Sequence, residues 1–160
     1  ETRTVFSQPG MRYSQAEALI KSLIQDNRFR NLSFNERKRV TERILDEVKG
    51  RMMEDIVLLE TKLSKKNCEV FRLQFAVGEY DMVVFNHEEG NCQIYEIKHS
   101  KEMVLQQCRH LLDKKKSEET EFRYGTITGK YVIYRGKNAE LKNASEPIFY
   151  LNVEDYLKNL

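Results

Sequence analysis

The stretch GEYDMVVFNHEEGNCQIYEIKHS, residues 78–100, decides the fold. Two runs rich in Val, Ile, Phe and Tyr flank the polar sequence HEEG at 87–90. This pattern predicts a β-hairpin closed by a four-residue turn. Both runs are apolar on both faces, which is typical of central strands that are covered on two sides. They nevertheless contain several charged residues, which buried strands rarely carry.

The turn determines which of these charged residues face each other. When the residues that flank the turn are paired, Asp81 lies opposite Glu96. In the same register Glu79 lies opposite Lys98. Because residues two apart share a face of a strand, all four side chains are expected in one block on one face.

Two carboxylates in opposed positions repel each other, and partial burial makes the repulsion worse. The pair of Asp81 and Glu96 therefore needs positive charge between its members. Lys98 supplies one such charge, and a divalent cation would supply two more. Hard carboxylate oxygens without Cys or His favour Mg²⁺ or Mn²⁺. The alternative is an ordinary cross-strand ion-pair cluster on a solvated face.

Helical periodicity dominates the first third of the chain. The S-x-x-E sequences at Ser14 and Ser33 are capping boxes and predict the starts of two helices. Apolar residues at three- and four-residue steps predict that the second helix is long and amphipathic, over about residues 35–64. Its apolar stripe consists of Val40, Ile44, Val48, Met52, Ile56, Leu59 and Leu63.

The periodicity changes to that of strands after residue 67. Further elements are expected as strands at 68–77, 80–86, 92–99, 124–136 and 147–152, a helix over 101–116, a loop at 136–146 and a helical turn after 152. Strands and helices mixed in this order predict an α/β fold, with a central mixed sheet flanked by helices and extra helices at the N-terminus.

The long helix carries a third candidate acid. Glu54 follows Met52 and Met53 and precedes a run of apolar residues, so it borders the expected buried face. There it is placed to join the hairpin acids at a shared site. The alternative is a partly exposed acid at the edge of the apolar stripe.

The composition fits one globular domain of 160 residues, of which 40% are hydrophobic and 32% charged. No apolar run is long enough for a membrane helix. Three widely spaced cysteines favour reduced thiols in a cytoplasmic protein over disulfides or a zinc site. Basic clusters at 35–39, 65–66 and 114–116 are typical of solvated faces, or of a surface that follows a phosphate backbone if they converge.

The order of these acids resembles a known pattern. This chain has an acid on a helix, then an Asp on a strand, a turn, and Glu-x-Lys on the next strand. That order, carried by Glu54, Asp81 and Glu96-Ile97-Lys98, resembles the PD-(D/E)XK nuclease superfamily. The resemblance implies a restriction-endonuclease-like αβββαβ core at 35–160 behind a helical extension at 1–34, together forming a single nuclease-like domain.

The chain resembles one branch of that superfamily more closely than the others. The segments QPGMRYSQAEALI, ERILDEVKGRMMEDIVLLETK, LQFAVGEYDMVVF and YEIKHSKE are similar to the C-terminal nuclease-like domain of prokaryotic AAA+ family ATPases. That resemblance implies an ATPase module upstream of this chain. The chain has no G-x-x-x-x-G-K-[ST] phosphate loop, so no nucleotide is expected to bind here.

The resemblance also implies roles for individual residues. Asp81 and Glu96 would ligate Mg²⁺ or Mn²⁺, together with the Ile97 carbonyl and with Glu54. Lys98 would orient the attacking water or stabilise charge on the scissile phosphate. Supporting roles are expected for Gln106 or Gln107 on the following helix and for Glu79, either as an outer ligand or as a group that neutralises Lys98.

Three functions remain open from the sequence. The first is Mg²⁺-dependent hydrolysis of DNA phosphodiester bonds by a domain appended to an ATPase. The second is a catalytically inactive nuclease-like domain that binds DNA or a partner and positions or regulates the ATPase. The third is a plain α/β interaction domain.

Overall fold

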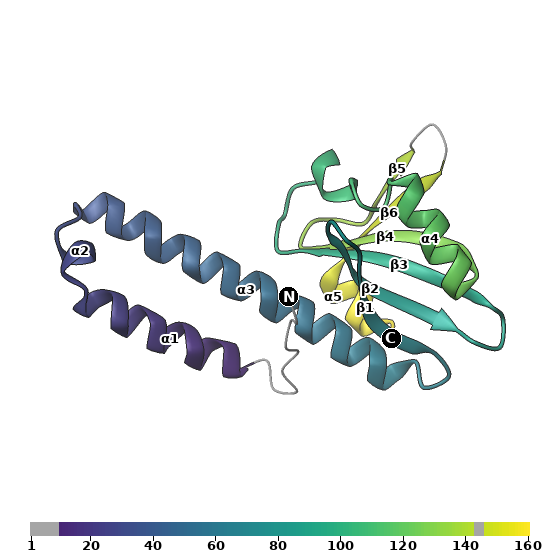
Figure 1. Ribbon diagram of the computed structural model, residues 1–160, viewed down its shortest axis with the longest axis horizontal. Helices are drawn as coiled ribbons and strands as arrows, with labels where there is room; N and C mark the ends of the chain where they lie inside the picture. The colour runs from purple at the N-terminus through teal and green to yellow at the C-terminus, as the bar shows by residue number, and fades with distance from the viewer. Residues whose placement is uncertain (1–9, 143–145) are drawn as a thin grey trace. The chain divides into compact units, whose positions relative to one another are not determined.

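The computed structural model describes residues 10–142 and 146–160, which divide into two compact units at Ile56. The first unit contains helices α1 (Gly10–Gln25) and α2 (Asn27–Arg30) and the beginning of α3 (Phe34–Ser64). The second contains the end of α3 and all the strands (Figure 1). Each unit is described below by itself.

The helices of the first unit begin at sites that the sequence predicts only in part. The capping box at Ser33 is confirmed, because its hydroxyl and the Glu36 carboxylate bond to each other and to each other's backbone N–H. The capping box at Ser14 is wrong, since α1 is already helical from Gly10. The short helix α2 was not expected; Asp26 caps it by accepting a hydrogen bond from the N–H of Arg28 at 2.6 Å.

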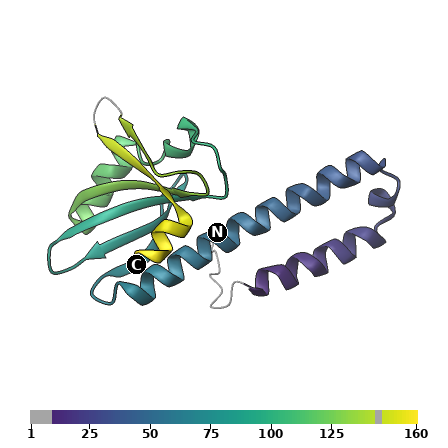
Figure 2. The ribbon, with the colours of Figure 1, turned by 180° about the vertical axis from the view of Figure 1, so that it is seen from behind.

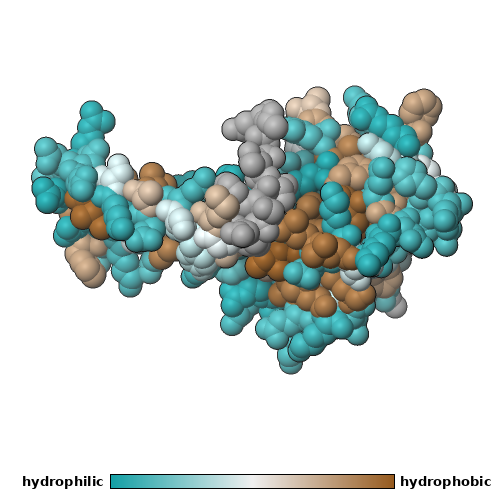
Figure 3. All heavy atoms as spheres, turned by 90° about the horizontal axis from the view of Figure 1, so that it is seen from below, coloured by the Kyte–Doolittle hydropathy of each residue, from teal (hydrophilic) through white to brown (hydrophobic). Residues whose placement is uncertain are grey.

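The long helix α3 matches its predicted bounds, but its buried side chains differ from the predicted stripe. The buried positions are Met53, Asp55, Val57, Leu58 and Thr61, whereas Leu63 is exposed. Asp55 forms an ion pair with Arg12 of α1, which explains how a carboxylate can be fully buried there. On the face drawn in Figure 3, the helices of this unit are mainly hydrophilic, with isolated hydrophobic residues between.

The second unit is built on one six-stranded mixed sheet. Its strands run in the spatial order β1-β2-β3-β4-β6-β5. The pairs β3–β4 and β4–β6 are parallel, and the other three are antiparallel. The bounds are β1 Glu69–Gln74, β2 Glu79–Asn86, β3 Asn91–Lys98, β4 Thr126–Tyr134, β5 Ala139–Lys142 and β6 Pro147–Asn152. The predicted α/β class with a mixed sheet is therefore confirmed, and β5 corrects the loop expected at 136–146.

The register of the β2–β3 hairpin is the one that the turn predicts. Asn86 pairs with Asn91, and the register continues without a shift to Met82 opposite Tyr95. The Asn86 side chain caps the turn by accepting hydrogen bonds from two turn N–H groups. Gly90 closes the turn with φ of 62°, a conformation that favours glycine.

A β-bulge interrupts the other side of β2. Leu73 of β1 pairs with Tyr80, whereas Phe71 pairs with Val83, so two residues of β2 face one residue of β1. The extra residue lies at Asp81 or Met82. Tyr80 and Val83 consequently pack in the same core cluster. Side chains do not alternate regularly between the two faces of a strand across a bulge. The alternation that placed Glu79 on the face of Asp81 therefore does not hold.

Helices cover both faces of the sheet. Figures 1 and 2 view it from opposite sides and show α4 (Lys114–Tyr124) over one face and α5 (Val153–Lys158) over the other. On the α4 side, side chains such as Val83, Ile94 and Val132 form the main core. On the α5 side, Tyr95 packs against Tyr156. Among the described residues, no helix combines the length and apolarity needed to cross a membrane.

The helix predicted over 101–116 is wrong. The segment forms a short 3₁₀ helix, η1 (Leu105–Cys108), and α4 begins only at Lys114, where Asp113 caps it. The physical reason lies at Val104, whose carbonyl accepts the Tyr150 hydroxyl and the i+3 N–H of Gln107. Those bonds replace the i+4 bond that an α-helix would need.

Candidate functional site

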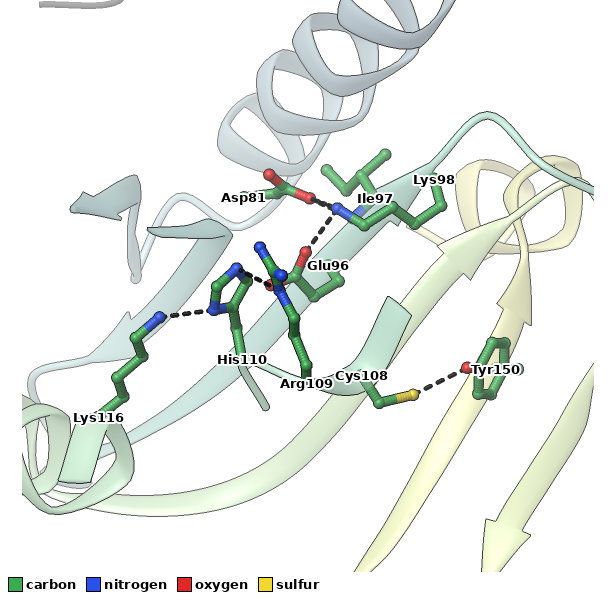
Figure 4. A network of polar contacts seen from close by, with 9 residues as sticks. All are labelled: Asp81, Glu96, Ile97, Lys98, Cys108, Arg109, His110, Lys116 and Tyr150. Carbon is green, nitrogen blue, oxygen red and sulfur yellow. Dashed lines mark hydrogen bonds and ion pairs between the residues drawn. The ribbon is translucent and has the colours of Figure 1, made fainter. Parts of the chain in front are cut away.

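The site lies at the open end of the β2–β3 hairpin, beyond the last pair of Met82 and Tyr95. The Nζ atom of Lys98 lies 2.8 Å from Oδ2 of Asp81 and 2.6 Å from Oε2 of Glu96 (Figure 4). One ammonium therefore bridges two carboxylates from neighbouring strands. We call Asp81 and Glu96 the acidic pair.

The bulge explains how Asp81 reaches this position. Its Oδ2 atom accepts a hydrogen bond of 2.7 Å from the backbone N–H of Ile97 on β3. A side chain thus takes the place of a ladder bond, and the carboxylate is fixed in the plane of the sheet. In an extended strand the N–H and C=O of one residue point to the same side, so we expect the Ile97 carbonyl to face the same gap.

Glu96 is the most deeply buried ionisable group of the site, with 1% of its surface exposed. Burial, assisted by Asp81 and opposed by Lys98, raises the pKa of Glu96 to about 8. Among the described residues its Oε1 atom has no hydrogen-bond partner. A buried oxygen in that state is costly unless a proton, a water or a cation satisfies it.

Lys98 remains charged in this environment. Burial lowers the pKa of Lys98, but Asp81 and Glu96 more than offset that effect and hold it above its ordinary value. The site is therefore a protonated lysine between two carboxylates, of which one ionises only near pH 8. At neutral pH Glu96 holds a proton that a cation could displace.

The oxygen atoms of the site fit a hard divalent cation in part. Carboxylate oxygens of Asp81 and Glu96 and the Ile97 carbonyl are the ligand types that Mg²⁺ and Mn²⁺ prefer. Oε1 of Glu96 accepts no hydrogen bond from the described residues, so its lone pairs suit such a ligand role. No cluster of three or more His, Cys, Asp or Glu with metal-binding geometry occurs in the parts of the chain that the structure describes. Such a cation would need waters or substrate oxygens to complete its shell.

The other predicted site residues lie on α3, at the start of β2 and in η1. Glu54 is half-buried on α3 in the first unit. Glu79 starts β2, where it pairs with Gln74 of β1. The amide of Gln107 bonds to the backbone of residues 102 and 104 and so stabilises the loop, while Gln106 is exposed. Their roles at the site stay predictions.

Sequence reasoning missed a basic cluster beside the site, made of Arg109, His110 and Lys116 (Figure 4). The Lys116 ammonium lies 2.6 Å from Nδ1 of His110. The only signal in the sequence was the lysine run at 114–116, which gives no indication of which lysine turns inward. Comparison with protein-family models finds no match to this chain, and comparison with curated proteins finds none either.

Proposed function

We propose that this chain is a cytoplasmic PD-(D/E)XK nuclease-like domain, carried downstream of an AAA+ ATPase module, that hydrolyses DNA phosphodiester bonds with Mg²⁺ or Mn²⁺. The observation that carries the proposal is the acidic pair, buried on adjacent strands and bridged by Lys98. The order α3-β1-β2-β3-α4-β4 supports it, because it has the αβββαβ succession of that superfamily.

The residues at the site suit the chemistry. Asp81 and Glu96, with the Ile97 carbonyl, would hold the cation. When bound, a divalent cation lowers the pKa of water and neutralises charge on a phosphate. The Ile97 N–H keeps the Asp81 carboxylate oriented. Lys98, once a cation takes over the carboxylates, is free to donate to a water or to a phosphate oxygen.

The second candidate is an inactive nuclease-like domain that binds DNA or a partner. One observation favours it: Lys98 already bridges both carboxylates, so the acidic pair has an internal counter-ion. In that case the ion pair would serve stability, and the domain would position or regulate the ATPase.

A calorimetric titration with Mn²⁺ tests the cation site. We expect the wild-type chain to bind the ion and Asp81→Asn to bind it at least about tenfold more weakly, a loss of about 1.4 kcal/mol. Glu140→Gln, an exposed acid on β5, is the matched control and should bind as the wild type does. Equal affinity of wild type and Asp81→Asn, or no binding by either, contradicts the cation site.

Cleavage of supercoiled and linear DNA in Mg²⁺ tests the reaction. We expect activity that Asp81→Asn lowers by about 10² or more, as losses of charge-stabilising groups commonly do. Lys98→Arg keeps the charge but changes the donor geometry, so activity should fall there too. Cation binding without any cleavage would favour the inactive domain, and cleavage that both variants retain would come from a contaminant.

A further inference from the structure

The basic cluster of Arg109, His110 and Lys116 is held close to the acidic pair. It lies on the loop after η1 and on the first turn of α4. Burial, Lys116 and Arg109 have the largest effects on the pKa of His110 and lower it, while Lys98 lowers it and Asp81 raises it to smaller extents. Such couplings act over short distances, so the cluster and the acidic pair share one environment.

The fold fixes the cluster in place from two directions. Next to Arg109, Cys108 is fully buried, and its Sγ atom lies 2.8 Å from the Tyr150 hydroxyl on β6. From the other side, Gly78 packs against the cluster with φ of 80°; a Cβ there would lie 2.5 Å from Cε1 of His110 and 2.9 Å from Nζ of Lys116. The turn that leads into the strand of Asp81 therefore abuts the cluster directly.

The hydrogen-bond donors of the cluster outnumber its acceptors. Burial, with Lys116 and Arg109, lowers the pKa of His110, so at neutral pH its ring is uncharged and has one lone pair. Lys116 contacts Nδ1 at 2.6 Å, and Nε of Arg109 points at Nε2 from 3.3 Å. One lone pair cannot accept from both. Whichever ring nitrogen carries the hydrogen, either Lys116 or Arg109 therefore faces a ring N–H and has no acceptor on His110.

In the part of the chain that the structure describes, the positive charges of the cluster also lack ion-pair partners. Lys116 is only 8% exposed, yet its ammonium contacts the neutral His110 ring and the face of Phe75 at 5.2 Å. Among the described residues neither Arg109 nor Lys116 makes an ion pair with a carboxylate. A buried ammonium without a counter-ion is costly, and an anion with several acceptor oxygens would satisfy all three groups.

We propose that Arg109, His110 and Lys116 form a phosphate-binding subsite that holds a backbone phosphate of DNA beside the acidic pair. The choice of DNA rests on the proposed function, whereas the choice of phosphate rests on the cluster itself. Arg and Lys donors with an imidazole N–H match the acceptor oxygens of a phosphodiester. The subsite lies next to the groups that would act on a neighbouring phosphate of the same strand.

The test is the salt dependence of DNA binding without turnover, measured by fluorescence anisotropy in Ca²⁺ with a short labelled duplex and the matching single strand. We expect Arg109→Ala to weaken binding irrespective of base sequence and to reduce the slope of log K against log salt by about 0.9 for duplex or about 0.7 for single strand. Arg109 is exposed, so this variant is expected to fold. Lys116→Met should add a similar loss.

Arg123→Ala is the matched control, since Arg123 lies near the other end of α4 and pairs with Glu119. It should leave the slope unchanged. If the slope stays at the wild-type value in both Arg109→Ala and Lys116→Met, the subsite is overturned. This holds even if the titration still shows Mn²⁺ binding at the acidic pair. Conversely, altered slopes with no Mn²⁺ binding support the subsite and overturn the cation site, so the two proposals fail separately.

Discussion

Replacing Glu96 with Gln is expected to stabilise the domain at pH 8 in the absence of divalent cations. The pKa of Glu96 is raised to about 8 by burial and by Asp81, against an ordinary value near 4.5. Between these two values the folded state holds a proton that the unfolded state has released. The contribution of Glu96 to stability therefore falls as pH rises through this window, by about 1.4 kcal/mol per pH unit, and does not change with pH outside it.

Glu96→Gln removes that dependence because glutamine resembles the protonated acid and has no proton to lose. The difference in unfolding free energy between variant and wild type should be small near pH 4.5 and grow to a few kcal/mol at about pH 8. Urea unfolding in EDTA across this range measures it. Glu140→Gln on β5 controls for loss of an exposed acid. A difference that is flat with pH, or that shrinks as pH rises, contradicts the raised pKa.

The same substitution separates stability from binding. With saturating Mn²⁺ the wild type should regain the unfolding free energy that it loses when Glu96 ionises. A ligand that binds only the folded state adds about 2.7 kcal/mol at a hundredfold excess over its dissociation constant. The Glu96→Gln variant should gain much less. A buried carboxylate that destabilises the fold and is satisfied only by a ligand is the pattern of a functional group.

The sequence predicted the parts of the fold that depend on local rules. A four-residue turn and a period of two are enough to place Asn86 opposite Asn91. That register, extended one pair beyond Met82 and Tyr95, sets Asp81 beside Glu96, and Lys98 contacts both carboxylates. The bulge beside Asp81 was not predictable, because it depends on the pairing of β2 with β1 rather than on the hairpin. Because of the bulge, the hairpin register alone does not place Glu79 on the face of Asp81.

The segment after β3 was less predictable for a different reason. Apolar residues at helical spacing favour a helix over 101–116, and two of them, Cys108 and Leu111, are indeed fully buried. Tyr150 lies far along the chain, however, and its hydroxyl donates to the Val104 carbonyl. A tertiary contact of this kind overrides helix propensity and leaves no local signal. The basic cluster on that loop was missed with it.

Replacing Lys98 with Met is expected to be the most damaging single change at the site. It removes the ammonium that contacts both members of the acidic pair and leaves Asp81, which is 5% exposed, beside Glu96 with the Ile97 N–H as a donor. Breaking a buried ion pair from one side typically costs about 3–5 kcal/mol, and the 32% exposure of the Lys98 side chain places this loss toward the lower end of that range. The variant should be destabilised by an amount of that order at pH 8 in EDTA, measured by urea unfolding, while Lys115→Met, an exposed lysine on α4, should change little.

The cause of that loss is testable by removing a carboxylate as well. Asp81→Asn in the Lys98→Met background takes away the charge that the lysine neutralised, so the double variant should be more stable than Lys98→Met alone. Added Mn²⁺ should also restore stability to Lys98→Met, and should do so far less when Asp81→Asn is present. If Lys98→Met unfolds like the wild type, the lysine is a solvated surface cation. If the variant is destabilised but neither the Asp81→Asn substitution nor Mn²⁺ restores it, the loss does not come from uncompensated charge on the acidic pair. If both restore it, lysine and divalent cation are alternative counter-ions for one pair of carboxylates, which is the exchange that a metal-dependent site built on these residues requires.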